Sequence, residues 1–190
     1  MDSGTKRSVG RPRSESARRA ILDAAFALAA EEGAAGMTME AVARRAGVSK
    51  ETLYRWWRSR VDVLLDALAG RGEREIPVPR GDDLAADLRT FMRATARALD
   101  APMQRVLRTL AAQAAGDPAF AQQVRERFLS HRRAALAEVL DRHEVHPDRA
   151  AIALDFVFGS LWYRLVFGVG PLDRGWADAV AAAIADQRTS

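Results

Sequence analysis

The spacing of apolar residues is the feature that most restricts how this chain of 190 residues can fold. Apolar side chains recur every three or four positions along most of the sequence, which is the period of an amphipathic helix, and no segment shows strand-like alternation. Alanine, the strongest helix former, supplies 38 residues, and most of the seven prolines lie between the periodic segments. We therefore expect an all-α protein of about nine helices.

Cap residues, glycines and prolines divide the chain into these helices, because Ser, Thr and Asp favour helix starts and Gly favours helix ends. The expected starts are Ser14 or Ser16, Thr38, Ser49, Ser59, Asp82 or Asp83, Pro102, Asp117 and Pro147, with a ninth helix around Trp176, Val180 and Ile184. The corresponding ends are expected near Gly33, Gly47, Trp57, Gly70, Asp100, Gly116, His143 and Gly168.

The positive charge of the chain is concentrated in its first third. The formal net charge is +4, but residues 1–60 carry 12 basic and 7 acidic groups, whereas residues 61–190 carry 17 and 18. A basic module beside a near-neutral body indicates nucleic acid or an anionic surface as the partner.

The sequence shows no feature of a secreted or membrane-spanning protein. No apolar stretch near the N-terminus has the form of a secretory signal, and the longest apolar run, residues 150–168, contains Asp155 and Arg164. We therefore expect a cytoplasmic protein that does not bind a membrane. The chain has no cysteine, which excludes disulfides, cysteine-ligated metals and thiol nucleophiles.

The second and third expected helices have the proportions of a helix-turn-helix. They are joined by Gly47-Val48, a turn short enough for one helix to brace the other while the second enters a DNA major groove. At ~100° per residue, Leu53 and Trp57 share one face and can anchor the second helix on the first. Glu51 and Arg55 share the opposite face, which is free to meet DNA.

The sequence of this region, MTMEAVARRAGVSKETLYRWWRSRVDVLLDAL, resembles the DNA-binding region of the TetR family of transcriptional repressors. The resemblance is strong over about residues 14–70 and only architectural beyond them. We therefore divide the chain into a flexible basic arm (1–13), a helix-turn-helix domain (14–60) and a helical effector-binding and dimerisation domain (61–190). The matching residues are Thr38, Ala46-Gly47-Val48-Ser49, Thr52-Leu53-Tyr54, Trp57 and Arg60.

The resemblance implies a sequence-specific DNA-binding regulator, most simply a repressor that a small, largely apolar effector releases from its operator. It also implies a homodimer on double-stranded DNA with two half-sites, without a cofactor. A ligand-independent regulator whose C-terminal domain only dimerises is one alternative. A small helical enzyme is another, although the sequence holds no phosphate-binding loop, zinc-protease motif or nucleophile elbow.

Geometry and the resemblance together assign roles in DNA binding. Hydroxyls, cations and helix starts suit phosphate groups, and Arg is the best side-chain partner for guanine. The expected base-reading residues are Thr52 and Arg55. The expected phosphate contacts are Thr38, Ser49, Lys50, Tyr54 and Arg60.

Four further residues have two interpretations each. Glu51 stands where the family often has a small residue, and it can accept from a cytosine amine or pair with Arg55. Trp56 stands where His or Tyr is common, so its indole contacts DNA or simply packs. Arg11 and Arg13, in Gly10-Arg11-Pro12-Arg13, form a minor-groove hook or belong to a solubilising tail.

The expected helix over residues 147–168 is apolar nearly all round, so it must be covered on several sides. A partner subunit supplies that cover in a dimer, and a helix fully buried within the monomer is the alternative. The residues expected at the dimer interface are Gly159, Ser160, Tyr163, Trp176, Val180 and Ile184.

Bulky residues of the C-terminal part supply the expected effector cavity, although each of them would equally suit an ordinary core. The candidates are Phe91, Met92, Met103, Leu107, Leu110, Phe120, Phe128, Phe156 and Trp162, with Gln113, His131 and Arg164 as polar groups. His143 and His146 lie three residues apart beside Glu144 and could ligate a metal. We favour a solvated helix end there and expect no metal site.

Overall fold

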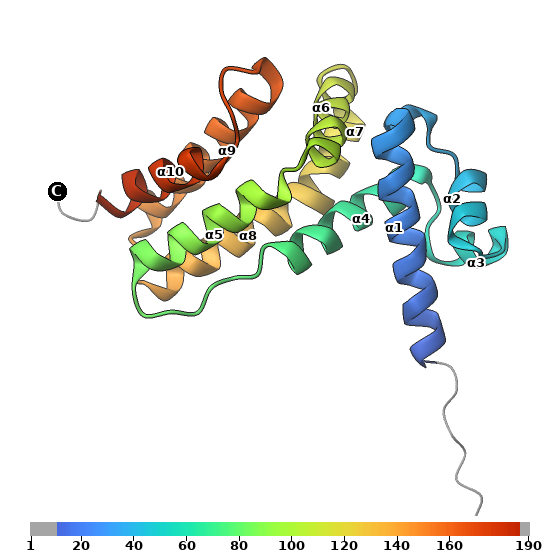
Figure 1. Cartoon of the computed structure of the whole chain (residues 1–190), viewed down its shortest axis with the longest axis horizontal. Coiled ribbons are helices and arrows are strands. Elements are labelled where there is room, and N and C mark those ends of the chain that lie inside the picture. Colours follow the sequence, from blue (N-terminus) through green and yellow to red (C-terminus); the bar gives the residue numbers. More distant parts are fainter. Residues whose placement is uncertain (1–10, 187–190) are drawn as a thin grey trace, which may run out of the picture. The chain divides into compact units, whose positions relative to one another are not determined.

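The computed structural model describes residues 11–186, and every regular element in that range is a helix (Figure 1). The elements are α1 (Arg11–Gly36), α2 (Met39–Ala46), α3 (Lys50–Trp56), α4 (Arg60–Glu75), α5 (Leu84–Ala98), α6 (Ala101–Gly116), α7 (Pro118–Val124), the π-helical turn η1 (Arg125–Leu129), α8 (Ser130–Arg142), α9 (Pro147–Phe167) and α10 (Arg174–Asp186). Because α7, η1 and α8 continue without a break, this range holds nine continuous helical segments. The predicted all-α fold is confirmed.

Most helices start where their cap residues predict. The side chains at four predicted starts accept a hydrogen bond from the backbone N–H three residues on: Thr38, Ser49, Asp83 and Asp117. The first helix differs, because α1 begins at Arg11, ahead of Ser14 and Ser16. Gly33, with φ at 78°, interrupts α1 at the residue predicted to end it.

The chain divides into two compact units, and the division falls within α4, between Ala67 and Leu68. The sequence-based boundary after residue 60 lies at the start of the same helix. In the N-terminal unit α1 packs against α2, and α2 packs against α3. The core of this unit includes Ile21, Leu22, Leu28, Val42, Leu53 and Trp57.

In the C-terminal unit α5 lies between α10 and α8, and α9 packs against α6 and α8 (Figure 1). Arg93 of α5 and Asp178 of α10 form a two-pronged ion pair with N···O distances of 2.6 and 2.9 Å. Hydrogen bonding from Arg93 holds the pKa of Asp178 below its ordinary value. The largest buried side chains of this unit include Leu88, Phe91, Met92, Leu110, Leu136, Leu140 and Leu165.

α9 is long and apolar enough to cross a membrane by length and composition alone, with a mean hydropathy of 1.5. One helix of this kind is weak evidence for a membrane span, and Asp155 within it pairs with Arg133 of α8 at 2.9 Å. Only 22% of its most apolar stretch is buried inside the chain. Much of its apolar surface is therefore open to solvent in the isolated chain.

Asp87 of α5 is a buried carboxylate that ties together three segments. It accepts hydrogen bonds from the backbone N–H of Gly81 at 3.1 Å, and lies 3.0 Å from His143 Nε2 and 3.5 Å from the guanidinium of Arg142. His143 therefore has a structural partner, while His146 caps the start of α9. Within residues 11–186 there is no group of three or more potential metal ligands.

We expect Asp87→Asn to lower the free energy of unfolding by about 1–3 kcal/mol, because it weakens a charge-assisted network in a buried place. Urea denaturation followed by circular dichroism measures the change. Asp82→Asn, at an exposed position, is the matched control. Equal stabilities of the two variants would show that the buried carboxylate contributes nothing to folding.

Candidate nucleic-acid interface and ligand cavity

The turn between α2 and α3 has the geometry of a helix-turn-helix. Gly47 adopts a left-handed conformation with φ at 68°, and its N–H returns to the carbonyl groups of Ala43 and Arg44. Ser49 then caps α3, accepting from the N–H of Thr52 at 3.2 Å. The two helices are thereby joined by a tight turn whose conformation glycine adopts without strain.

The anchoring face of α3 is the predicted one. Leu53 is fully buried and Trp57 is 2% exposed. The indole N–H of Trp57 donates to Asp66 of α4 at 2.8 Å, and the guanidinium of Arg18 from α1 lies over the same ring. Trp57 therefore joins the end of α3 to α1 and α4, which fixes the orientation of the recognition helix.

The opposite face of α3 points to solvent. Tyr54 is 48% exposed, and Arg55 is exposed with its guanidinium 5.5 Å from the centre of the Trp56 ring. Trp56 in turn meets Trp57 edge-on at 5.6 Å. This face presents a phenol and a guanidinium, which are groups that can contact phosphates and base edges, while Trp56 is half-buried at its border.

Glu51 and Lys50 already have partners within the chain. The carboxylate of Glu51 is hydrogen-bonded by its own backbone N–H and by Ser49, which lowers its pKa. Lys50 Nζ lies 3.0 Å from Glu40, whose pKa it lowers. The predicted alternative of a Glu51–Arg55 pair is thus replaced by local capping of Glu51, and a phosphate contact by Lys50 must displace Glu40.

Arg60, a predicted phosphate contact, donates to the backbone carbonyl of Ala34 at 3.1 Å and is half-buried. It therefore also holds the start of α4 against the end of α1. Arg45 pairs with Glu31 of α1, where its guanidinium donates to the carboxylate at 2.7 Å. The mutual hydrogen bonding raises the pKa of Arg45 and lowers that of Glu31.

The structure describes only the backbone of part of the predicted minor-groove hook. Gly10 lies outside the described residues, as do the side chains of Arg11 and Arg13, whose backbone begins α1. Their contact with DNA stays a prediction.

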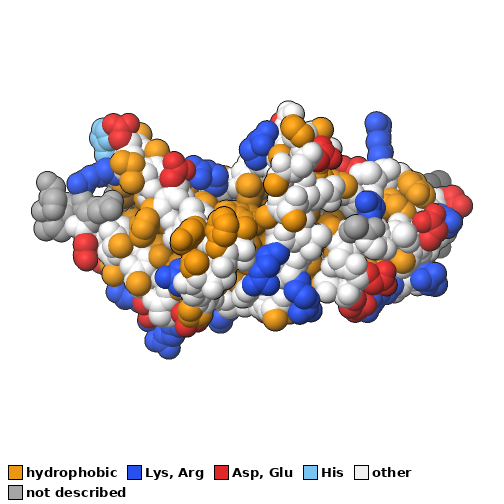
Figure 2. All heavy atoms as spheres, turned by 90° about the horizontal axis from the view of Figure 1, so that it is seen from above, with side chains coloured by type: hydrophobic (Ala, Val, Ile, Leu, Met, Phe, Trp, Pro, Cys, Tyr) orange, Lys and Arg blue, Asp and Glu red, His pale blue; other side chains and the backbone are white. Residues whose placement is uncertain are grey.

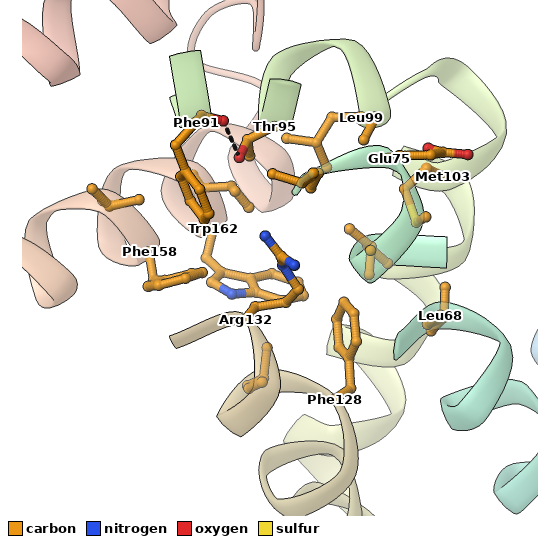
Figure 3. A pocket seen from close by; sticks show the side chains of 17 residues that line it. Leu68, Glu75, Phe91, Thr95, Leu99, Met103, Phe128, Arg132, Phe158 and Trp162 are labelled. Atoms are coloured by element: carbon orange, nitrogen blue, oxygen red, sulfur yellow. Dashed lines mark hydrogen bonds between the residues drawn. The ribbon is translucent and has the colours of Figure 1, made fainter. Parts of the chain in front are cut away.

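The C-terminal unit contains a partly open apolar cavity walled by α4, α5, α6, η1, α8 and α9 (Figure 3). Its free volume is about 60 Å³, which holds a few water molecules. A larger ligand would therefore require the walls to move apart. Five residues predicted for the effector site line it: Phe91, Met103, Leu107, Phe128 and Trp162.

The other seven predicted effector residues do not line this cavity. Met92, Leu110 and Phe120 are buried elsewhere in the unit, whereas Phe156 is 44% exposed and His131 is also exposed. Gln113 is half-buried outside the cavity, and Arg164 donates to the carbonyl of Pro171 at 3.2 Å.

The sequence reasoning missed Arg132, a polar residue of the cavity wall. Arg132 is only 8% exposed, although charged residues are rarely buried. Its position held a signal, since it lies four residues after Phe128 and four before Leu136 on the buried stripe of one continuous helix.

The predicted dimer residues occupy two different environments. Trp176, Val180 and Ile184 are buried within the monomer, on the helix that packs against α5. Tyr163 is exposed and meets Phe167 at a ring distance of 5.6 Å. The exposed large apolar residues of this region are Ile152, Phe156, Tyr163, Val166, Phe167 and Val169, and Figure 2 shows hydrophobic side chains gathered on the surface near the end of α9.

Comparison with known proteins matches both parts of the chain. Residues 21–67 match the description "Bacterial regulatory proteins, tetR family", and residues 78–184 match "Tetracyclin repressor-like, C-terminal domain". The chain belongs to the TetR family. The HTH-type transcriptional regulator YdeS of Bacillus subtilis (strain 168) is 31% identical over 162 residues, which cover 83% of this chain and 82% of YdeS.

Two further comparisons support this TetR-family assignment. The crystal structure of the TetR-family regulator SCO0332 has 32% identity and a TM-score of 0.76, covering 90% of this chain and 97% of its own. The repressor KstR of Rhodococcus jostii (strain RHA1) is 49% identical over 57 residues, 30% of this chain and 27% of KstR. The chain is therefore a helix-turn-helix transcriptional regulator and not an enzyme, as predicted.

Proposed function

We propose that this TetR-family protein is a cytoplasmic, homodimeric repressor that leaves its operator when a small, largely apolar effector enters the cavity. The observation that carries the proposal is the extent of α4. This helix begins at Arg60, a predicted phosphate contact, and its C-terminal half supplies Leu68 and Gly72 to the cavity wall. A ligand that pushes this wall outward therefore moves a helix that also belongs to the DNA-binding unit.

The roles proposed for Arg55 and Lys50, two cations of α3, lead to different expectations for their variants. Arg55→Ala should cost about 1–3 kcal/mol of operator binding and relax the preference at one base pair, because Arg55 is the proposed guanine reader. Lys50→Ala should weaken binding to all sequences alike. It should also reduce the slope of log affinity against log salt concentration by about one. Fluorescence anisotropy with operator and single-substituted duplexes at several salt concentrations separates the two effects. Identical behaviour of the two variants would refute this assignment of roles.

The proposed dimer interface is the exposed apolar face of α9. We define this α9 face as Ile152, Phe156, Tyr163, Val166 and Phe167. An apolar patch of this kind usually marks an interaction site. A short recognition helix reads only a few base pairs, so a second copy on a second half-site is what gives the required specificity. Gly159 and Ser160 lie in the same helix and permit close helix approach.

Release by a ligand is tested with the purified protein and a genomic DNA fragment that has been enriched by binding to it. A thermal-shift screen of small apolar compounds identifies those that raise the melting temperature, and each is then titrated into the protein–DNA complex. The proposal expects at least one stabilising compound to dissociate the complex. Stabilising compounds that leave every complex intact would contradict it.

One observation favours a second function, that of a regulator whose C-terminal unit only dimerises. The cavity of about 60 Å³ is small for an effector before its walls move. A screen without any stabilising compound, combined with intact operator binding, would support this alternative.

A further inference from the structure

The cavity of the C-terminal unit contains one cation, Arg132, whose side chain forms no ion pair with the residues that the structure describes. Arg132 is 8% exposed, and within residues 11–186 its side chain forms no hydrogen bond or salt bridge. Figure 3 shows its side chain reaching into the cavity among aromatic residues. Its guanidinium forms a cation–π contact with Phe91, whose ring centre lies 5.4 Å from the guanidinium carbon.

The carboxylates nearest to Arg132 do not neutralise it. Glu75 lines the same cavity, but its Oε1 forms an ion pair with Arg71 Nε at 2.8 Å. Burial lowers the pKa of Arg132, and the charge of Glu73 offsets this only in part. A guanidinium remains protonated in proteins, so the free chain bears the cost of a buried and poorly compensated charge.

The backbone of α4 makes room for this side chain. Gly72 lies against Arg132 so closely that a Cβ on it would be 3.0 Å from Arg132 Cδ. Elsewhere the cavity is lined mainly by aliphatic and aromatic groups, with the hydroxyl of Thr95 already donating to the carbonyl of Phe91 at 3.0 Å. Arg132 is therefore the only cation among the residues that line the cavity.

We propose that this cavity binds an amphipathic anion, with a carboxylate against the Arg132 guanidinium and an apolar body between Phe128, Phe158 and Trp162. The planar fork of a guanidinium donates two parallel hydrogen bonds to a carboxylate, and such charge-assisted bonds are strongest where water is excluded. The inference rests on the proposed ligand-released function only in naming this anion as the effector. Binding itself is a separate claim.

The test compares matched pairs of ligands by isothermal titration calorimetry with the full-length protein. The probes are straight-chain carboxylic acids of four to twelve carbons and the primary alcohols of the same lengths. We expect the best acid to bind about 10- to 100-fold more tightly than its alcohol, which is the effect of a charge-assisted hydrogen bond. Arg132→Met should abolish this preference, and Arg132→Lys should retain part of it. Arg125→Met, at an exposed position of η1, should leave it unchanged.

A stability measurement separates a binding role from a structural one. Arg132→Met should raise the melting temperature by about 2–4 °C, because it removes a poorly compensated buried charge and keeps the apolar stem. Equal binding of every acid and its alcohol, failure of every acid to bind, or an acid preference that survives in Arg132→Met would overturn the proposal. A melting temperature several degrees lower would show that Arg132 has a structural role and would also overturn it.

The same titrations keep the two claims apart. If acids bind through Arg132 but do not dissociate the protein–DNA complex, the anion site stands and ligand-released repression fails. If alcohols and acids release DNA equally well, repression by release stands and the anion site fails.

Discussion

Replacing Phe156 and Phe167 together by aspartate is expected to split the proposed dimer and lower operator affinity by about two to four orders of magnitude. Phe167 is 71% exposed in the isolated chain, and both residues belong to the α9 face. Two carboxylates on each copy would bring four negative charges into an apolar interface, where they cannot be solvated. A monomer would then bind one half-site without the gain from a linked second contact.

Sedimentation velocity measures the oligomeric state, and fluorescence anisotropy measures the operator affinity. The control carries the same added charge on exposed positions of α7, as Ala119→Asp with Gln123→Asp, and should remain dimeric. Retention of the dimer by the double Phe variant would place the interface elsewhere in the chain.

Trp57→Ala is expected to lower the free energy of unfolding of the N-terminal unit by about 3–5 kcal/mol, as is usual when a large buried aromatic is removed. The change leaves a cavity behind α3, removes the hydrogen bond to Asp66 and frees Arg18 from the ring. Operator binding should fall together with stability, because α3 loses the contact that fixes its orientation. Urea denaturation followed by circular dichroism gives the free energy.

Two matched variants identify the cause. Trp57→Phe keeps most of the buried volume but loses the indole N–H, so we expect a cost of about 1–2 kcal/mol. Trp56→Ala removes a half-buried neighbour and should cost less than Trp57→Ala. If Trp56→Ala were the more damaging variant, the assignment of Trp57 as the anchor of the recognition helix would be wrong.

The helices and the helix-turn-helix could be predicted because their signals are local. Thr38 and Ser49 cap the helices that they precede, and Gly47 takes the left-handed conformation that the turn needs. The faces of α3 follow from helical periodicity, and Leu53 and Trp57 are buried as it requires. The start of α1 at Arg11 was less predictable, because helix ends are set by weak preferences over several residues.

The cavity was less predictable, because its lining depends on how distant helices pack. Met92 and Phe91 are adjacent and both buried, yet only Phe91 faces the cavity. Apolar periodicity also does not say whether a helix face meets its own chain or a partner. Trp176 illustrates this, since it is buried within the monomer although it fits an interface stripe equally well.

The most direct test of the central claim is a measurement of sequence-specific DNA binding. Genomic fragments enriched on the purified protein would be titrated against a shuffled duplex of equal length and composition at about 150 mM salt. The account predicts that the enriched fragment binds at least about 10³-fold more tightly, with an affinity that falls steeply as salt rises. Equal affinities for the enriched and shuffled duplexes would contradict it.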